Sequence, residues 1–501
     1  MIAGSKRKWR RILVGMLIAI GCIAILVARP AFHLIRTSLH DEVYVEVLPP
    51  GFVDDASRLN QTQIAEVWSV PEDAEAAESQ LSDLLTRARN DKKKVSIAGA
   101  RHSMGGHTVY PGGIVIDMLP FNHMELDESS GMLRVGAGAL WSEIIPYLDR
   151  RGRSVAVMQS NNSFSVGGSI SVNCHGWVYD RPPIASTVES FRLMKPDGMI
   201  VRCSRQENPE LFSLALGGYG LFGIILDVEL RVVPNERYRL EQFVVQVDQS
   251  LETFERTVLE KAGVHMVYAR MNIVPDRLFE EIILNVFYHE PDGEPPALAA
   301  SGMVELRRAI FRGSAESDYG KELRWNAETR LQPFLSKKIF SRNQLLNEGA
   351  ETFQDRSAAT TDILHEYFVP PDRVGGFVEQ VRAILPRHRG NLLNVTVRSV
   401  NADEDSFLRY ADQRMFSFVM LFSQPRKEAA EHEMARLSRD LIDAALKNGG
   451  RYYLPYRLHA TRDQFDKAYP QGREFFELKR KYDPDELFQN QFYVRYGRRG
   501  A

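Results

Sequence analysis

Val95-Ser-Ile-Ala-Gly-Ala-Arg-His-Ser-Met-Gly-Gly-His107 is the most informative stretch of this 501-residue chain. The run Val95–Ile97 predicts a short strand, and glycines 99, 105 and 106 predict a turn that follows it. Successive backbone N–H groups in such a turn can converge on an anion, and glycine lets phosphate oxygens approach without a Cβ in the way. The same residues also suit an ordinary hairpin loop. A metal site is not indicated, because the two histidines have no carboxylate or third ligand nearby.

A second stretch, Ser163-Phe-Ser-Val-Gly-Gly-Ser-Ile-Ser-Val-Asn-Cys-His-Gly176, has small residues at nearly every other position. A strand or loop with so little bulk suits a position flat against a planar ligand. A glycine-rich bulge in a sheet is the alternative interpretation.

A third stretch, Gly218-Tyr-Gly-Leu-Phe-Gly223, formally matches the GxGxxG pattern. A dinucleotide-binding fingerprint follows a strand and opens a helix. Here the pattern follows the helical-looking segment Pro209–Leu216 and opens the predicted strand Ile224–Val233. The inverted order argues against a nicotinamide site and leaves a tight turn near a phosphate as the interpretation.

With these three stretches in this order, the chain from about Val67 to Pro234 resembles the FAD-binding domain of the vanillyl-alcohol oxidase superfamily, also called the PCMH-type domain. Gly99-Ala-Arg-His-Ser103 is similar to that family's GxGHS phosphate loop. In the sugar-lactone, alditol and cytokinin oxidising branches, the histidine of this loop carries a covalent flavin bond. The resemblance therefore implies FAD, covalently bound through His102. Arg101 is a departure, because the family usually has glycine there.

The C-terminal stretch Tyr482-Asp-Pro-Asp-Glu-Leu-Phe-Gln-Asn-Gln-Phe492 resembles the close of aldonolactone oxidases, where an asparagine reaches the flavin. A simple helix stop at Asp483-Pro484 is the alternative. The resemblance assigns the following residues to the cofactor: Gly99, Ala100, Arg101, His102, Ser103, Gly106, Gly167, Gly168, Ser169, Asn173, His175, Gly176, Gly220, Gly223, Ile224 and Asn490.

Beyond Pro234, longer predicted strands alternate with helices, which favours an antiparallel sheet with helices on one side. The predicted strands are Phe243–Val247, Ile282–Tyr288, Leu364–Val369, Leu393–Val397 and Met415–Phe422, and Glu431–Lys447 is a predicted amphipathic helix.

The resembling lactone and alditol enzymes carry a Glu-x-Arg pair on a cap strand, where this chain reads Asn394-Val-Thr-Val-Arg398. Strand alternation places Thr396, at the acid's position, on the same face as Arg398. Arg398 can orient an alcohol oxygen or stabilise developing negative charge. An arginine paired with an acid at a strand end is the alternative.

The family's histidine-tryptophan pair and lysine before the final helix are replaced here by Tyr452-Tyr-Leu-Pro-Tyr-Arg457. Tyr456 and His459 are therefore the catalytic candidates of this segment, with Tyr453 as a further one. Each of these side chains also suits a packing role.

The bulk composition limits the partners of the chain. The 63 basic and 65 acidic residues nearly cancel, which argues against a nucleic-acid binder. The three cysteines are too few and too scattered for a disulfide framework or a zinc site.

The N-terminus differs in composition from the rest. Five basic residues precede the run Ile12–Ala28, which contains no charge. As a helix this run measures about 25 Å, enough for a tilted membrane span. The charge distribution predicts a single-pass anchor with the catalytic body on the periplasmic or extracytoplasmic side. A cleaved signal peptide is the alternative, and Arg10-Arg11 hints at a twin-arginine signal.

Together these observations predict an α+β protein with four regions. Residues 1–36 form the basic terminus and transmembrane helix, 55–236 a two-subdomain PCMH-type FAD-binding domain, 237–450 an α+β substrate (cap) domain with a mostly antiparallel sheet, and 451–501 a segment that returns to the flavin.

The expected activity resembles D-arabinono-1,4-lactone oxidase: an alcohol carbon of a polyol, sugar or aldonolactone gives hydride to flavin N5, and oxygen, a quinone or a cytochrome reoxidises the flavin. One alternative is a sterol-reductase-like membrane flavoenzyme, although the phosphate loop of that branch lacks the histidine. The other is a catalytically silent flavin-fold membrane partner.

Overall fold

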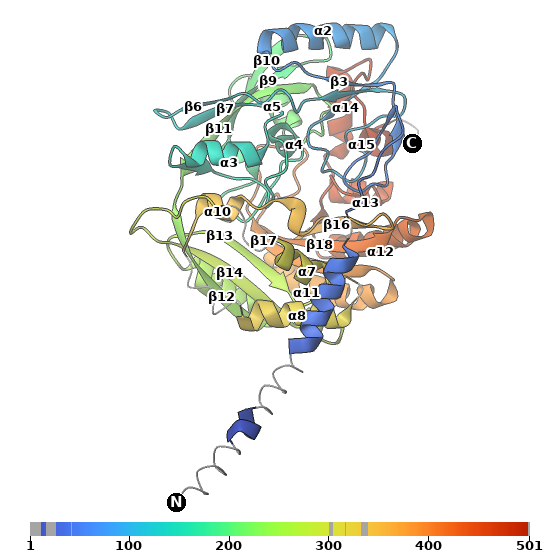
Figure 1. Ribbon diagram of the computed structural model, residues 1–501. Helices are drawn as coiled ribbons and strands as arrows, with labels where there is room; N and C mark the ends of the chain where they lie inside the picture. The colour runs from blue at the N-terminus through green and yellow to red at the C-terminus, as the bar shows by residue number, and fades with distance from the viewer. Residues whose placement is uncertain are drawn as a thin grey trace, which may run out of the picture.

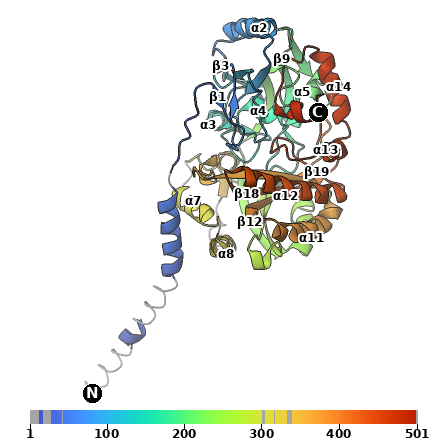
Figure 2. The ribbon, with the colours of Figure 1, turned by 90° about the vertical axis from the view of Figure 1, so that its right-hand side faces the viewer.

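The computed structural model describes residues 12–16, 27–41, 43–299, 304–315, 317–331 and 339–498. Figures 1 and 2 show a body of two stacked parts and a helix that leaves it on the N-terminal side. The part drawn at the top holds the glycine-rich stretches, and the part below it holds the large sheet.

The upper part contains two sheets. A parallel sheet has the order β3 (Glu66–Ser69), β5 (Ile114–Asp117), β4 (Val95–Ala98). The second sheet is antiparallel, with the order β10 (Ile200–Ser204), β9 (Val188–Met194), β11 (Ile224–Pro234), β7 (Met132–Gly136), β6 (Met124–Asp127), and β8 (Arg153–Val155) also pairs with β11.

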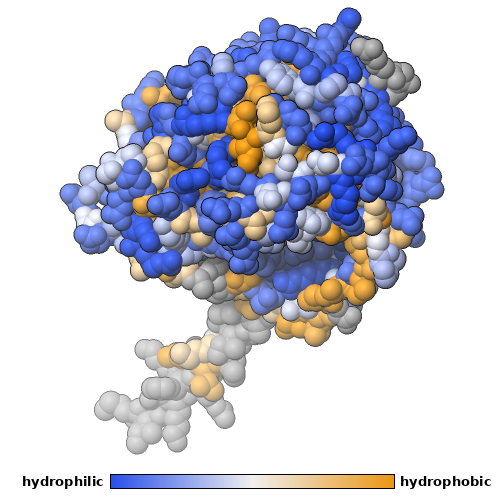
Figure 3. All heavy atoms as spheres, turned by 90° about the horizontal axis from the view of Figure 1, so that it is seen from above, coloured by the Kyte–Doolittle hydropathy of each residue, from blue (hydrophilic) through white to orange (hydrophobic). Residues whose placement is uncertain are grey.

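Helices pack on these sheets through single apolar faces. α2 (Ala74–Asn90) buries Ala77, Leu81, Leu84, Leu85 and Ala88. It begins after Asp73, whose side chain accepts the backbone N–H of Ala76. Further helices of this part are α3 (Trp141–Asp149), α5 (Pro209–Ala215) and, from the C-terminal segment, α13 (Arg462–Ala468), α14 (Gly472–Tyr482) and α15 (Gln491–Tyr496). The face seen from above, in Figure 3, is mostly hydrophilic.

One predicted conformation was wrong. The small-residue stretch after Ser163 was expected as a strand or loop, but Val166–Ser171 is a short helix, α4. A Cβ at Gly167 would lie 2.8 Å from the Cβ of Ala137, so glycine allows this helix to pack closely after the end of β7. The small side chains therefore serve helix packing rather than a flat strand.

The lower part confirms the predicted antiparallel sheet. Its eight strands run in the order β15 (Ile339–Ser341), β12 (Arg237–Gln246), β14 (Glu281–His289), β13 (Val264–Met271), β17 (Asn391–Val400), β18 (Met415–Pro425), β16 (Thr360–Val369), β19 (Arg451–Tyr452). α11 (Val374–Ile384) and α12 (Glu428–Lys447) lie together on its outer side (Figure 1). The central strand β13 was not predicted, and β19 comes from the segment after the expected cap boundary.

The N-terminal helix over residues 27–40 packs on α7 (Val304–Arg312) and α8 (Asp318–Asn326), as Figures 1 and 2 show. The His33 Nε2 donates to the Gly313 carbonyl at 2.8 Å, and the Arg29 guanidinium lies 3.9 Å from the ring centre of Tyr319. Among the described residues, no helix is long and apolar enough to cross a membrane. Most of the predicted anchor, residues 17–26, lies outside the described residues.

Candidate active site

A cavity of about 850 Å³ lies between the glycine-rich loops of the upper part and the inner face of the large sheet. Its upper wall includes the loop after β4, α4 and the turn before β11, and its lower wall includes strands from β12 to β16. We refer to these as the glycine wall and the sheet wall.

Ten of the predicted cofactor residues line the cavity: Gly99, Ala100, Arg101, His102, Ser103, Gly167, Gly168, His175, Gly220 and Gly223. The others do not line it: Gly106, Ser169, Asn173, Gly176, Ile224 and Asn490. At least one of these residues forms a hydrogen bond to a residue of the lining. The Asn490 Nδ2 donates to the carbonyl of Tyr219 at 2.9 Å, and Tyr219 lines the cavity.

The glycine wall depends on close backbone approach. A Cβ at Gly99 would lie 2.0 Å from the Ser165 Oγ and 3.0 Å from its Cβ, so glycine lets the loop after β4 pack closely on the start of α4. Gly220 has φ +71 and Gly223 has φ +154, both in the region that glycine favours. At these positions, which we call the glycine cradle, the residues that line the cavity have no side chain.

Arg101 brings an unpaired charge to this cradle. Its Nε and Nη2 atoms are buried and have no hydrogen-bond partner in the part of the chain that the structure describes, and the same holds for the Ser103 Oγ. The Arg101 backbone is left-handed, with φ 53, which is strained for a residue with a Cβ. Burying two guanidinium nitrogens without a hydrogen-bond partner is costly, so this donor set fits the diphosphate of FAD.

His102 stacks on Phe164, with ring centres 4.1 Å apart. Its Nε2 lies 3.0 Å from the Ser163 carbonyl oxygen, which can only accept, so Nε2 carries the proton and Nδ1 keeps its lone pair. Burial lowers the pKa of His102, which favours this neutral form. His107 also lines the cavity, and burial lowers its pKa to about 3.

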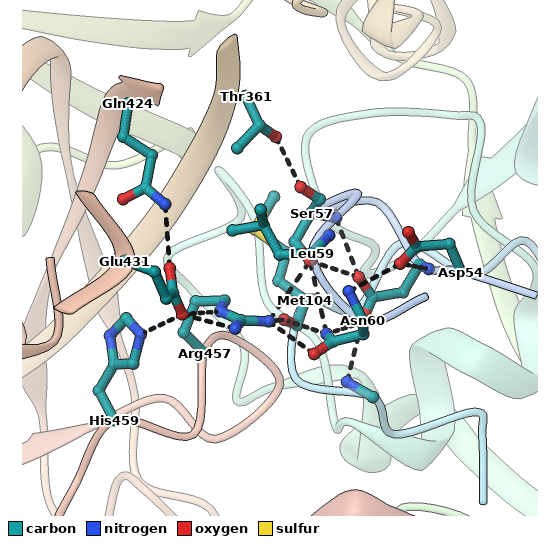
Figure 4. Close-up of polar contacts among 12 residues, drawn as sticks. Asp54, Ser57, Leu59, Asn60, Met104, Thr361, Gln424, Glu431, Arg457 and His459 are labelled. Atoms are coloured by element: carbon teal, nitrogen blue, oxygen red, sulfur yellow. Dashed lines mark hydrogen bonds and ion pairs between the residues drawn. The ribbon is translucent and has the colours of Figure 1, made fainter. Parts of the chain in front are cut away.

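A polar network holds the loop that carries His102 (Figure 4). The Met104 carbonyl accepts from the Asn60 Nδ2 and the Arg457 Nη1, both at 2.9 Å. Arg457 pairs with Glu431, which also accepts from the His459 Nε2 at 2.8 Å. His459 therefore lies outside the cavity lining and contacts the support of the loop, not the other predicted catalytic residues.

The sheet wall presents Thr396 and Arg398 to the cavity on one face of β17, as strand alternation predicts. The Arg398 Nη2 donates to the Ser160 Oγ at 2.9 Å and Nη1 to the His175 carbonyl at 3.3 Å, while the buried Nε has no partner. Among the described residues no carboxylate forms an ion pair with Arg398, so it is not the arginine of a strand-end salt bridge.

Glu366 of β16 lines the same wall and was not predicted. Its carboxylate accepts from the His175 Nε2 and the Ser417 Oγ, both at 2.5 Å, and from the Tyr456 hydroxyl at 3.1 Å. Burial alone raises the pKa of Glu366, but its interaction with the His175 imidazole and its other hydrogen bonds lower it overall, so the carboxylate is ionised. Its sequence signal was an acid inside an otherwise largely apolar predicted strand.

The register explains how Glu366 reaches the site. Val419 of β18 pairs with Thr396 on one side and with Glu366 on the other. The three residues therefore form one row across the sheet. The carboxylate of Glu366 lies two strands away from Thr396, the position at which the resembling enzymes have an acid.

Tyr456 lines the cavity, and its hydroxyl acts there as a hydrogen-bond donor. Burial first, and then the charge of Glu366, raise the pKa of Tyr456 well above its usual value. Its hydroxyl stays protonated and donates to Glu366 at 3.1 Å.

A glycine cradle with an unpaired cation, facing a buried carboxylate, histidine and arginine, fits a site in which a phosphate-containing redox cofactor meets a polar substrate. Residues 75–204 match the model of a family described as "FAD binding domain". The L-gulonolactone oxidase of Mus musculus is 23% identical over 428 residues, which cover 82% of this chain and 92% of the relative.

Two further relatives match shorter regions. The putative D-arabinono-1,4-lactone oxidase of Neurospora crassa is 26% identical over 40% of this chain and 35% of its own length. The mitochondrial L-galactono-1,4-lactone dehydrogenase 2 of Oryza sativa subsp. japonica is 27% identical over 38% of this chain and 32% of its own length. The chain is an FAD-linked oxidoreductase with a PCMH-type FAD-binding domain, distantly homologous to these lactone oxidases and dehydrogenases.

Proposed function

We propose that the protein oxidises an alcohol carbon of a polyol, sugar or aldonolactone. The observation that carries this proposal is the Glu366–His175 pair beside Arg398, in the cavity that the FAD-binding loops also line. The names of the relatives, which are lactone oxidases and dehydrogenases, support the same substrate class.

Each residue of the sheet wall has a role in this reaction. The flavin, when bound, accepts hydride at N5. Arg398 orients the substrate oxygen and stabilises negative charge on it, and the Thr396 hydroxyl offers a hydrogen bond on the same face. Ionised Glu366 holds the Nε2 proton of His175, so Nδ1 keeps the lone pair that takes the hydroxyl proton. The substrate thus loses one proton and one hydride, and oxygen, a quinone or a cytochrome removes the two electrons.

The test is anaerobic bleaching of the flavin absorbance by a panel of xylitol, sorbitol, D-arabinono-1,4-lactone, L-gulono-1,4-lactone, a sterol and an aromatic alcohol. A polyol or lactone is expected to reduce the flavin fastest. Reduction by the sterol alone would overturn the substrate class. Folded protein that binds no FAD would show instead a silent flavin-fold partner.

We also propose that His102 is the site of covalent flavin attachment. Support comes from its place in the glycine wall and from the free lone pair on Nδ1. Attachment would join this nitrogen to the flavin 8α carbon; it would release one methyl proton and leave two electrons on the ring, which the ordinary electron acceptor would remove.

Acid-precipitated protein is expected to stay yellow, and a tryptic peptide that contains His102 to carry the mass of FAD. His102→Ala should hold flavin only by non-covalent contacts, whereas His107→Ala should stay labelled. Release of all flavin into the acid supernatant of the native protein would refute the covalent bond.

We further propose that residues 12–28 anchor the protein and that its body lies on the extracytoplasmic side. The support is the basic cluster that precedes this run. External protease should digest the body in intact spheroplasts of an expression host; full protection of the C-terminus would contradict this orientation.

A further inference from the structure

Two residues of the cavity lining carry polar atoms that the proposed reaction does not use. The Trp177 Nε1 and the Gln242 Oε1 are buried and have no hydrogen-bond partner among the residues that the structure describes. Both residues line the cavity.

Aromatic and amide side chains fix these two atoms in place. Trp177 stacks on Tyr268 of β13, with ring centres 4.6 Å apart and planes inclined by 25°. Tyr268 pairs across the strands with Asn285 of β14, and Asn285 pairs with Gln242 of β12. The Gln242 Nε2 donates to the Asn285 Oδ1 at 2.7 Å, so its Oε1 is the atom left free.

The chemistry of the two atoms selects a ligand group. An indole N–H can only donate and an amide oxygen can only accept, whereas a hydroxyl does both, so a ligand with several hydroxyls can pair with each atom. A carboxylate or phosphate would satisfy the Trp177 N–H but would repel the Gln242 oxygen. The stacked rings offer an apolar surface for the C–H face of a sugar ring.

The position of Gln242 indicates the length of the ligand, whereas Trp177 stacks on Tyr268 of β13, the strand that pairs with β17. The strand order β12, β14, β13, β17 places Gln242 three strands away from Arg398. Neighbouring strands are about 4.8 Å apart, which gives a separation of roughly 14 Å. This separation exceeds the span of one sugar ring.

We propose that Trp177 and Gln242 form a second sugar-binding subsite, which holds a neutral, hydroxylated unit linked to the unit that is oxidised beside Arg398. This inference rests on the proposed function for the reacting end. It makes the natural substrate a glycoside or an oligomeric sugar alcohol rather than a single aldonolactone.

The test measures equilibrium binding of sorbitol, maltitol and cellobiitol to the full-length holoprotein by calorimetry. Maltitol and cellobiitol both carry a glucosyl unit on sorbitol, through an α and a β linkage. At least one of them is expected to bind about tenfold more tightly than sorbitol, the gain from one well-placed buried hydrogen bond.

Gln242→Leu and Trp177→Phe are each expected to remove this preference and to leave sorbitol binding unchanged. Gln246→Leu is the matched control, because Gln246 lies exposed on the same strand, outside the cavity lining. Equal affinity of the native protein for all three alditols would overturn the subsite, and so would an equal loss for sorbitol and the disaccharides in both variants. If the preference is found but no alcohol reduces the flavin, the subsite stands and the proposed function fails.

Discussion

The glycine wall and the sheet wall enclose one cavity but are built in different ways. The glycine wall takes its shape from backbone within short stretches, such as the five residues Gly99–Ser103. The sheet wall assembles its polar groups from separate strands: Glu366 from β16, Arg398 from β17 and Asn285 from β14. A local motif therefore specifies the cofactor side, whereas strand register specifies the reacting side.

The two walls also differ in their charge balance. On the glycine wall the guanidinium of Arg101 has no anionic partner among the described residues. On the sheet wall the carboxylate of Glu366 accepts three hydrogen bonds. Changes in the sheet wall should therefore alter the rate of flavin reduction, and changes in the glycine wall should alter the affinity for FAD.

The largest effect is expected for Glu366→Gln. The amide keeps the shape of the side chain but removes the charge that stabilises protonated His175, so flavin reduction by the best polyol or lactone should slow about 10³-fold. Stopped-flow absorbance gives the rate, and flavin content per chain should not change. An equal fall in flavin content would mean that Glu366 contributes to cofactor binding. The sheet wall would then not act on the rate of flavin reduction alone.

Arg398→Ala should reduce the same rate about 10²-fold, the usual scale for one electrostatic contact to a reacting oxygen. Arg398→Lys should recover only part of the loss, because lysine keeps the charge but not the planar set of donors. Unchanged turnover in the alanine variant would show that Thr396 and Arg398 are not on the reacting face.

The contrast between the walls also determines what the sequence could predict. The loop around His102 and the turn at Gly220 were located because each lies within a few residues of the chain. Arg398 was found by strand alternation and a family pattern. Glu366 was not found, because its place beside Thr396 depends on two strand pairings that no local pattern encodes.

Two other differences have similar causes. The conformation of Val166–Ser171 was mispredicted, since small residues suit both a flat strand and a helix packed closely on Ala137. His459 was a candidate proton acceptor, yet its tertiary contacts place it beside Glu431 in the loop support. In both cases the deciding contact is remote in sequence.

The loop support between the walls gives a pH-dependent prediction. Burial by itself raises the pKa of Glu431, but the hydrogen bond from His459 and the charge of Arg457 lower it from 4.5 to about 2. A carboxylate with a depressed pKa stabilises the fold above its unfolded pKa, and this contribution is lost as the pH falls from about 4.5 toward 2. The shift corresponds to about 3 kcal/mol at neutral pH.

Glu431→Gln should therefore lower the free energy of unfolding at pH 7, and the difference from the native protein should shrink as the pH falls below 4.5. Urea unfolding at a series of pH values measures both. Glu428→Gln on the same helix is the control, because that side chain is 89% exposed. A constant difference across the pH range would show that the charge of Glu431 does not matter.

The smallest effect is expected on the glycine wall, for Arg101→Gly. Glycine removes the unpaired guanidinium and also accepts the left-handed backbone without strain. In a His102→Ala background, which keeps the flavin dissociable, affinity for FAD should fall about tenfold, as for loss of one charge-assisted hydrogen bond. Affinity for riboflavin, which has no diphosphate, should not change.

The melting temperature without flavin should not fall although FAD affinity falls. This result would distinguish the loss of a contact to FAD from a general loss of folding stability. Without flavin, Arg101→Gly should melt at the same or a higher temperature than its parent. Lys92→Gly is the matched control, since Lys92 also has φ 53 but lies in an exposed turn outside the cavity lining. It should relieve strain without changing FAD affinity. Equal losses for FAD and riboflavin in Arg101→Gly would mean that Arg101 shapes the loop and does not pair with the diphosphate.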